Sequence, residues 1–219
     1  MANGMKALSV EEFKNLMNTE IIILDTRNAK IFSHGFVPGS VSIGLEGRYA
    51  EWAGSLLPFD VPMLLVTEPG KEKESIVRLA RVGFEKVQGY LQGGFEAWKN
   101  AGKEIDMIID VEADELMMDI PHDKNLLVVD VRRATEFADG HLKDAVNLPL
   151  IDMNDPATMA DLEEDQNLYV HCEGGYRSII ASSLLKRQGF HNIRNVLGGW
   201  GKIKKQEKAE IVKETSVLN

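Results

Sequence analysis

Short apolar runs recur along the chain and predict buried strands. Residues 21–24 and 126–129 are continuous apolar stretches rich in β-branched side chains, and residues 63–66 and 168–170 form two further runs of this kind. Uninterrupted apolar runs are typical of strands that are buried on both faces of a parallel sheet. A Gly-containing loop and a short strand are predicted after each run of the first pair, and a loop and a helical stretch after each run of the second pair. This alternation predicts an α/β fold in which helices flank a mainly parallel central sheet.

Capping signals mark where the helices begin and end. Ser9 and Glu12 have the spacing of a capping box, which predicts a helix that continues through Leu16. We expect Asp110 to cap the counterpart of this helix in the second half of the chain. Two later helices are predicted to end at glycines in the C′ position, Gly83 and Gly189.

The chain contains an internal repeat. Segment 21–45 aligns with segment 126–150 in a constant register. The matched pairs are Asp25 with Asp130, Arg27 with Arg132, Phe32 with Phe137, Gly35 with Gly140 and Val41 with Val146. A second block reads Gly93-Gly94-Phe95 in the first half and Gly198-Gly199-Trp200 in the second. Two homologous modules are therefore predicted, residues 1–104 and 105–219, with a strand over 107–109 following the join.

Composition and charge exclude several classes of protein. The 219 residues carry a formal net charge of −9, which argues against a nucleic-acid partner because phosphate binding needs clustered Lys and Arg. The chain has no run of about 18 apolar residues and no signal peptide, so we expect a cytoplasmic protein without a membrane partner. The acidity belongs to the second module, where a solvated acidic surface explains it.

The single cysteine, Cys172, restricts the chemistry most. It excludes an intramolecular disulfide, a CxxC redox pair and a cysteine-cluster metal site, but it leaves a reactive thiol open. Cys172 follows the predicted strand 168–170 and precedes a predicted helix that runs through Gln188. In open α/β sheets the ligand crevice lies outside the carboxyl ends of the strands, and Cys172 is placed at such an end.

The residues after Cys172 favour an anionic sulfur. Gly174 and Gly175 allow successive backbone N–H groups to turn inward, and the start of the following helix adds unpaired amides and a positive dipole end. Such a cradle favours the thiolate form of a cysteine. Arg177 adds a fixed positive charge, with two roles left open: a clamp on nearby carbonyls or on Asp130, or direct substrate contact.

These motifs together resemble the tandem rhodaneses, a sulfurtransferase family. The second module has Asp130-Val131-Arg132 followed by Glu136-Phe137 and Gly140-His141, then the loop over residues 172–178, then Leu197-Gly198-Gly199-Trp200. The order and spacing of the three motifs match the family, and the resemblance covers nearly the whole chain. A polar tail, residues 204–219, is left over.

The resemblance implies a persulfide mechanism without a cofactor or a metal. Cys172 takes the role of the nucleophile that accepts sulfane sulfur from a small-molecule donor and passes it to a thiol or cyanide acceptor. The persulfide would be bound by the loop residues Glu173, Gly174, Gly175, Tyr176, Arg177 and Ser178. We expect Asp130, Arg132, Glu136 and His141 to be architectural, and we expect His171 to point away from the site and to be structural.

The first module lacks the nucleophile. In the simplest alignment Glu68 takes the place of the cysteine and Pro69 removes a donor amide, so this module is predicted to be catalytically silent. Arg48, Tyr49 and Trp52 have no counterpart in the second module. Two explanations are open for them: a wall beside the active cleft, or burial of the aromatic residues at a domain interface.

The first module also resembles the rhodanese pairs that follow a metallo-β-lactamase-type domain in persulfide dioxygenase fusions, through the stretch over residues 47–54 and Pro62. This implies a possible partner of that type, with the chain either free-standing or the sulfurtransferase part of a larger polypeptide. The metal chemistry would then lie outside this chain, because its five His residues form no metal-binding motif.

Three hypotheses on function follow. The first is a sulfurtransferase that uses Cys172. The second is a binding or regulatory module whose thiol is incidental. The third is a phosphatase or arsenate reductase, which the loop length disfavours: Arg177 follows Cys172 with four residues between them, and related folds that hold phosphate or arsenate have five.

Overall fold

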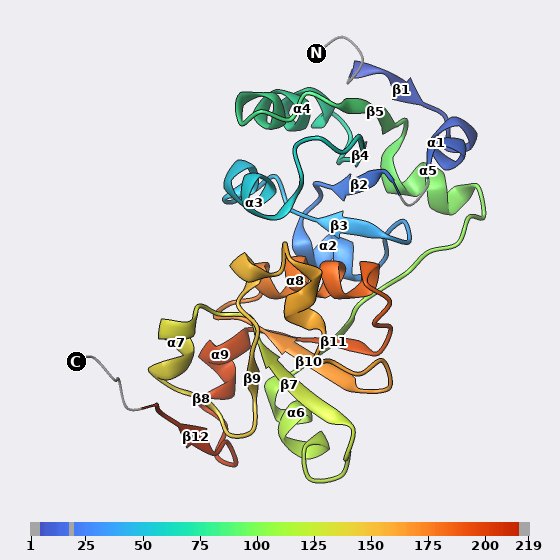
Figure 1. Ribbon diagram of the computed structural model, residues 1–219. Helices are drawn as coiled ribbons and strands as arrows, with labels where there is room; N and C mark the ends of the chain where they lie inside the picture. Colours follow the sequence, from blue (N-terminus) through green and yellow to red (C-terminus); the bar gives the residue numbers. More distant parts are fainter. Residues whose placement is uncertain (1–4, 18–19, 215–219) are drawn as a thin grey trace. The chain divides into compact units, whose positions relative to one another are not determined.

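The computed structural model describes residues 5–17 and 20–214, which fold into two compact units (Figure 1). The first unit comprises residues 1–107 and the second residues 108–219. The division therefore falls three residues after the join expected from the sequence. Each unit is an α/β sandwich with a five-stranded parallel sheet, as the pattern of apolar runs predicted.

The first unit has the strand order β1-β5-β4-β2-β3, with every pair parallel. Its strands are β1 (Ala7–Leu8), β2 (Ile22–Asp25), β3 (Ser40–Ser42), β4 (Met63–Val66) and β5 (Val87–Leu91). Its helices are α1 (Val10–Leu16), α2 (Ala29–Ser33), α3 (Tyr49–Leu56), α4 (Glu72–Arg81) and α5 (Gly94–Asn100). Helices α1 and α5 pack on one face of the sheet, while α3 and α4 pack against each other on the other face.

The second unit repeats this topology with the strand order β6-β11-β10-β7-β9. Its parallel strands are β6 (Ile109–Val111), β7 (Leu126–Asp130), β9 (Val146–Asn147), β10 (Asn167–His171) and β11 (Ile193–Val196). A separate antiparallel pair is formed by β8 (His141–Leu142) and β12 (Ile211–Val212). The helices are α6 (Ala113–Asp119), α7 (Ala134–Ala138), α8 (Tyr176–Arg187) and α9 (Gly199–Ile203), with short 3-10 turns η2 (Leu150–Asp152) and η3 (Pro156–Met159).

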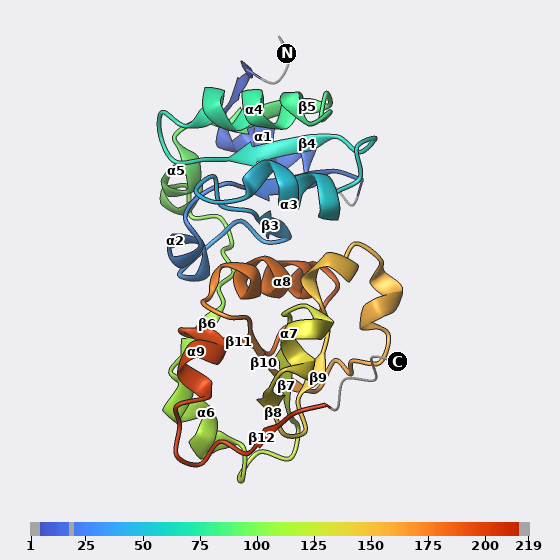
Figure 2. The same ribbon diagram turned by 90° about the vertical axis from the view of Figure 1, so that its left-hand side faces the viewer.

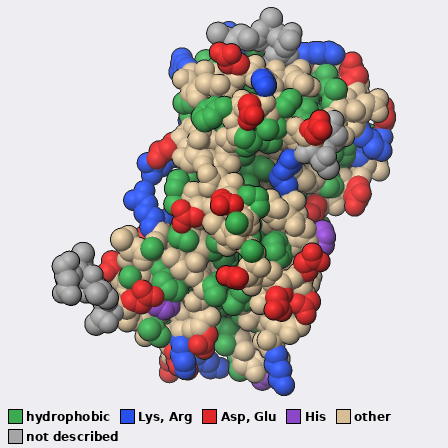
Figure 3. Space-filling model, in the orientation of Figure 1, with side chains coloured by type: hydrophobic (Ala, Val, Ile, Leu, Met, Phe, Trp, Pro, Cys, Tyr) green, Lys and Arg blue, Asp and Glu red, His purple; other side chains and the backbone are tan. Residues whose placement is uncertain are grey.

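The core of the second unit lies on both faces of this sheet (Figure 2). Helices α6 and α9 cover one face, where Leu116, Trp200 and Ile203 pack against Val128 and Tyr169. Helix α8 covers the opposite face, against β10 and β11. Acidic side chains are scattered over the outer surface of the same unit (Figure 3).

Most of the capping signals are confirmed. Ser9 and Glu12 form the predicted box, with the Ser9 N–H donating to Glu12 Oε2 over 2.8 Å and the Glu12 N–H donating to Ser9 Oγ over 3.3 Å. Gly83 and Gly189 follow the C-caps of α4 and α8 with φ values of 102° and 100°, a region that favours glycine.

The expected cap at Asp110 is wrong. Strand β6 pairs with β11 as far as Val111, two residues beyond the predicted strand end, so Asp110 lies inside a strand. Helix α6 is capped instead by Glu112, whose N–H donates to Glu115 Oε2 over 2.7 Å. The residue at which β6 ends is set by its pairing with β11, so the local sequence does not reveal it.

The repeated Gly-Gly pairs allow a helix to approach the end of a strand closely. Gly199 has φ 51°, and a Cβ atom there would lie 2.1 Å from the carbonyl oxygen of Cys172. Gly94 is its counterpart, with φ 61° and a Cβ position 2.8 Å from the carbonyl oxygen of Thr67. The same contact thus exists in both units, and in each unit a side chain at this glycine would overlap the backbone.

We predict that Gly199→Ala destabilises the second unit by about 2 kcal/mol or more, because the new Cβ must displace backbone and the positive φ is strained. The measurement is chemical denaturation followed by circular dichroism. Gly174→Ala is the matched control, since a Cβ at Gly174 has nothing within 4 Å. Equal midpoints for the two variants would contradict the prediction.

Candidate active site

Cys172 lies directly after β10, at the carboxyl end of a central strand, and its side chain is 2% exposed. The loop turns at Gly175, which has φ 116° and caps the N-terminus of α8. The Gly175 N–H donates to Cys172 Sγ over 3.1 Å, so the backbone stabilises negative charge on the sulfur. The amino-terminal end of a helix of 12 residues adds its positive dipole end beside the loop.

Ser178 also contacts the sulfur, from the first turn of α8. Its Oγ lies 3.8 Å from Cys172 Sγ, and its hydroxyl donates to Asn195 Oδ1 over 2.7 Å. Ser178 was among the predicted site residues. Asn195 was not predicted, because it lies on β11 and reaches the site only through the pairing of β10 with β11.

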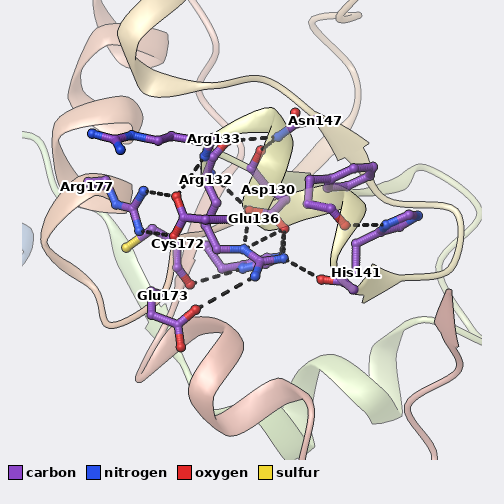
Figure 4. Close-up of polar contacts among 12 residues, drawn as sticks. Asp130, Arg132, Arg133, Glu136, His141, Asn147, Cys172, Glu173 and Arg177 are labelled. Carbon is purple, nitrogen blue, oxygen red and sulfur yellow. Dashed lines mark hydrogen bonds and ion pairs between the residues drawn. The ribbon is translucent and has the colours of Figure 1, made fainter. Parts of the chain in front are cut away.

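Arg177 is held by a carboxylate. Its two terminal nitrogens donate to Glu136 over 2.7 and 2.9 Å, and Figure 4 shows the guanidinium beside the Cys172 sulfur. Of the roles left open for Arg177, a clamp on Asp130 is not seen, since Arg132 occupies that carboxylate and Arg177 binds Glu136. The hydrogen bonds from Arg177 lower the pKa of Glu136 to about 2, and the same contact raises the pKa of Arg177.

Beneath the loop, Asp130 and Arg132 form a buried ion pair. The Arg132 guanidinium donates to Asp130 Oδ2 over 2.6 Å and to the Gly140 carbonyl over 2.8 Å. It lies 4.6 Å from the centre of the Trp200 ring, and its other terminal nitrogen is 3.7 Å from Glu173 Oε2. Glu173 is thereby tied to the scaffold, although its side chain is half exposed.

The first unit contains the same cluster without a cysteine. Arg27 donates to Asp25 over 2.6 Å and to the Gly35 carbonyl over 2.9 Å, and it lies over the Phe95 ring. An arrangement that recurs where no thiol is present serves the architecture of the unit.

Both histidines near the loop make structural contacts. His141 stacks on Phe137 with 3.6 Å between ring centres, and its Nδ1 lies 2.9 Å from the Phe137 carbonyl oxygen. His171 is fully buried, stacks on Trp200 and lies 3.7 Å from Asp130. Burial lowers the pKa of His171, which favours the neutral ring.

The sheet register corrects the alignment of the two loops. Val66 pairs with Asp25 as His171 pairs with Asp130, so the counterpart of Cys172 is Thr67. The expectation that Glu68 takes this place is wrong by one residue. The first loop has one more residue before its helix, since α4 begins at Glu72 and α8 at Tyr176.

The aromatic residue Tyr49, considered as a wall or an interface residue, belongs to the core of the first unit. It is fully buried, its hydroxyl donates to the Ser75 carbonyl over 3.4 Å, and Arg78 lies over its ring. Arg48 forms an ion pair with Glu51 in the same helix region.

In the described part of the chain, no group of three or more His, Cys, Asp and Glu side chains is arranged to hold a metal ion. The helices of residues 5–17 and 20–214 are also too short or too polar to cross a membrane.

Fold and site together define a two-unit α/β protein with one buried thiol at a helix N-terminus. The family model described as "Rhodanese-like domain" matches residues 9–101 and 112–206, so the chain belongs to the rhodanese-like family and contains the domain twice.

Relatives of known name cover parts of the chain. A sulfurtransferase of Allochromatium vinosum is 29% identical over 93 residues, which are 42% of this chain and 85% of that protein. A putative mitochondrial thiosulfate sulfurtransferase of Schizosaccharomyces pombe is 32% identical over 89 residues, 36% of this chain and 63% of that protein. The crystal structure of a thiosulfate sulfurtransferase from Pseudomonas aeruginosa is similar over 96% of this chain and 44% of that chain, with 17% identity and a TM-score of 0.43.

The Glu136 pair gives a prediction about acid stability. Because the pKa of Glu136 falls from 4.5 to about 2 on folding, the pair stabilises the second unit fully above about pH 4.5, and this contribution is lost as the pH falls toward 2. We expect Glu136→Gln to cost about 1 kcal/mol at pH 7, since the pair is partly screened by solvent. The difference from the wild type should shrink below pH 4.5.

Denaturation curves at several pH values check this, with Glu210→Gln as the control. Glu210 forms an exposed ion pair with Lys143, so its replacement should change stability little at any pH. A cost of Glu136→Gln that stays constant from pH 7 to pH 2 would show that the ion pair is not its source.

Proposed function

We propose that this protein is a sulfurtransferase that carries sulfane sulfur as a persulfide on Cys172. The observation that carries the proposal is the hydrogen bond from the Gly175 N–H to Cys172 Sγ at the N-terminus of α8. Membership in the rhodanese-like family and the sulfurtransferase names of two relatives support it.

In the loading step the Cys172 thiolate attacks the outer sulfur of the donor. A new S–S bond forms as the S–S bond within the donor breaks, and the electron pair leaves on sulfite if the donor is thiosulfate, or on a thiolate if it is a low-molecular-weight persulfide. The product is Cys–S–S⁻. The Gly175 amide and the positive end of α8 stabilise anionic sulfur at this position.

In the unloading step an acceptor thiolate, or cyanide, attacks the outer sulfur of the persulfide. The S–S bond between Cys172 Sγ and the outer sulfur breaks, and its electron pair returns to Cys172, which becomes a thiolate again. The acceptor leaves as a persulfide or as thiocyanate. Because the chain has one cysteine, a second molecule must supply the acceptor.

The site is less suited to phosphate or arsenate. Arg177, the cation nearest to an oxyanion in such a loop, already makes two hydrogen bonds to Glu136. Binding an oxyanion through it would require breaking a charge-assisted pair. The pairing with a metallo-β-lactamase-type domain and the cytoplasmic location stay predictions from the sequence.

The first unit acts as a silent partner in this proposal. Thr67 stands where the second unit has its cysteine, and a hydroxyl lacks the nucleophilicity of a thiolate at neutral pH. All sulfur transfer is therefore assigned to the second unit.

We predict that protein incubated with thiosulfate or glutathione persulfide gains one sulfur atom on the Cys172 peptide, detected by mass spectrometry. Cys172→Ser should abolish the adduct and lower turnover by at least about a thousandfold, because the nucleophile is lost. Thr67→Ser, at the equivalent position of the first unit, is the matched control and should leave both unchanged.

The alternatives give other results. Turnover of an aryl phosphate or of arsenate without a sulfur adduct would favour the phosphatase or reductase. A wild-type protein that is folded yet takes no sulfur from either donor would favour the binding module, and full turnover by Cys172→Ser would rule out the persulfide.

A further inference from the structure

Three side chains behind Cys172 form a continuous hydrogen-bonded chain. The Ser178 hydroxyl donates to Asn195 Oδ1 over 2.7 Å, and Asn195 Nδ2 donates to Asp110 Oδ1 over 2.7 Å. Ser178 is fully buried and Asn195 is 3% exposed, so water does not compete for the contact between them, whereas Asp110 is partly exposed. We call this set, Ser178, Asn195 and Asp110, the relay.

The relay fixes the direction of the Ser178 proton. The Asp110 carboxylate can only accept, which turns the Asn195 amide nitrogen toward Asp110 and its oxygen toward Ser178. The second polar neighbour of the Ser178 hydroxyl, the Gly175 carbonyl at 3.0 Å, also only accepts. The single hydroxyl proton therefore points away from the sulfur, and an oxygen lone pair faces Cys172 Sγ over 3.8 Å.

The first unit lacks the relay. In the strand register the counterpart of Asn195 is Tyr90, which pairs with Leu65 as Asn195 pairs with Val170. Tyr90 in turn pairs with Ala7, which stands where the second unit has Asp110. Whereas the ion pair of Asp130 and Arg132 recurs in both units, Asn195 and Asp110 occur only in the unit that has the cysteine.

We propose that Asn195 and Asp110 are positioning residues that keep Ser178 a hydrogen-bond acceptor toward Cys172. Ser178 then accepts the S–H proton of the resting thiol and orients the sulfur toward the loop. When the thiol loses its proton, the lone pair of Ser178 faces a negative charge and raises the energy of the thiolate.

A persulfide escapes this penalty. Its inner sulfur, Cys172 Sγ, has no formal charge, and the anion lies on the outer sulfur. The relay therefore favours the sulfur-loaded state over the free thiolate. The preference for the sulfur-loaded state rests on the proposed function, whereas the effect of the relay on the resting thiol does not.

The other charged and titratable groups around the loop are left intact by the variants below. Asp130 and Arg132 lie at and after the end of β7, and Glu136 lies on α7. His171 ends β10, Glu173 lies in the loop and Arg177 lies on α8.

The test is the pH dependence of alkylation by iodoacetamide, which reports on Cys172 alone because the chain has one cysteine. In Asn195→Leu the Ser178 proton has two acceptors left, the Gly175 carbonyl at 3.0 Å and the Cys172 sulfur at 3.8 Å. The thiolate is the stronger acceptor because it is charged, so the proton turns toward it once the thiol ionises. We expect the midpoint of the alkylation profile to move down by about one pH unit. Alkylation below both midpoints should then be about threefold faster, because the roughly tenfold larger thiolate fraction is partly offset by the lower nucleophilicity of a more acidic thiolate. Asp110→Asn should lower the midpoint by a smaller amount. An amide at position 110 can both donate and accept, so the Asn195 amide is no longer held with its oxygen toward Ser178.

Two controls separate positioning from a structural effect. Asp123→Asn alters a similar contact, Asn167 Nδ2 to Asp123 Oδ2 over 2.7 Å, at the opposite end of β10, and should leave the profile unchanged. In a Ser178→Ala background, Asn195→Leu should have no further effect, because the relay acts through the hydroxyl. Circular dichroism verifies folding, and Asp110→Asn decides the outcome if Asn195→Leu does not fold.

An unchanged or upward-shifted midpoint in Asn195→Leu, or a shift that persists without the Ser178 hydroxyl, would overturn the proposal. For the loaded state, the ratio of persulfide to free thiolate at equilibrium with a mixture of glutathione persulfide and glutathione, measured above both alkylation midpoints, should fall about tenfold in Asn195→Leu. If the alkylation profiles shift as expected but even the wild type takes up no sulfur, the proposed function fails and the positioning role stands.

Discussion

The buried ion pair of Asp130 and Arg132 is the constraint on which the site depends. Both groups leave water, and this is tolerated because the carboxylate receives three N–H groups of Arg132 and the guanidinium also reaches the Gly140 carbonyl and the Trp200 ring. The backbone N–H of Trp200 in turn donates to the Cys172 carbonyl over 2.7 Å. The position of the sulfur thus follows from a chain of contacts that begins at the end of β7.

Duplication separates scaffold from chemistry within one molecule. Both units keep the ion pair, the Gly-Gly approach and the parallel sheet, so these features belong to the stability of the fold. The thiol of Cys172 and the relay residues Asp110 on β6 and Asn195 on β11 occur in the second unit alone.

The fold could be predicted from the sequence because its signals are local. The run 63–66 becomes β4 without a change of boundary, and the repeat gives the two-unit division to within three residues. Errors arose where a position depends on a partner strand. Local signals place Asp110 in a helix cap and Glu68 opposite Cys172, whereas the sheet register places Asp110 in β6 and Thr67 opposite Cys172. Asn195 had no local signal, because its partners lie 17 and 85 positions away in the chain.

The deep position of the Cys172 side chain has a steric consequence for its reaction partners. An internal disulfide has a carbon substituent on each sulfur, and both would have to enter a site where the receiving sulfur is almost fully covered. A sulfur at the end of a chain has one substituent and can be presented tip first. Under the proposed function, the burial of the thiol favours donors that present a terminal sulfur atom, independent of the charge that the rest of the donor carries.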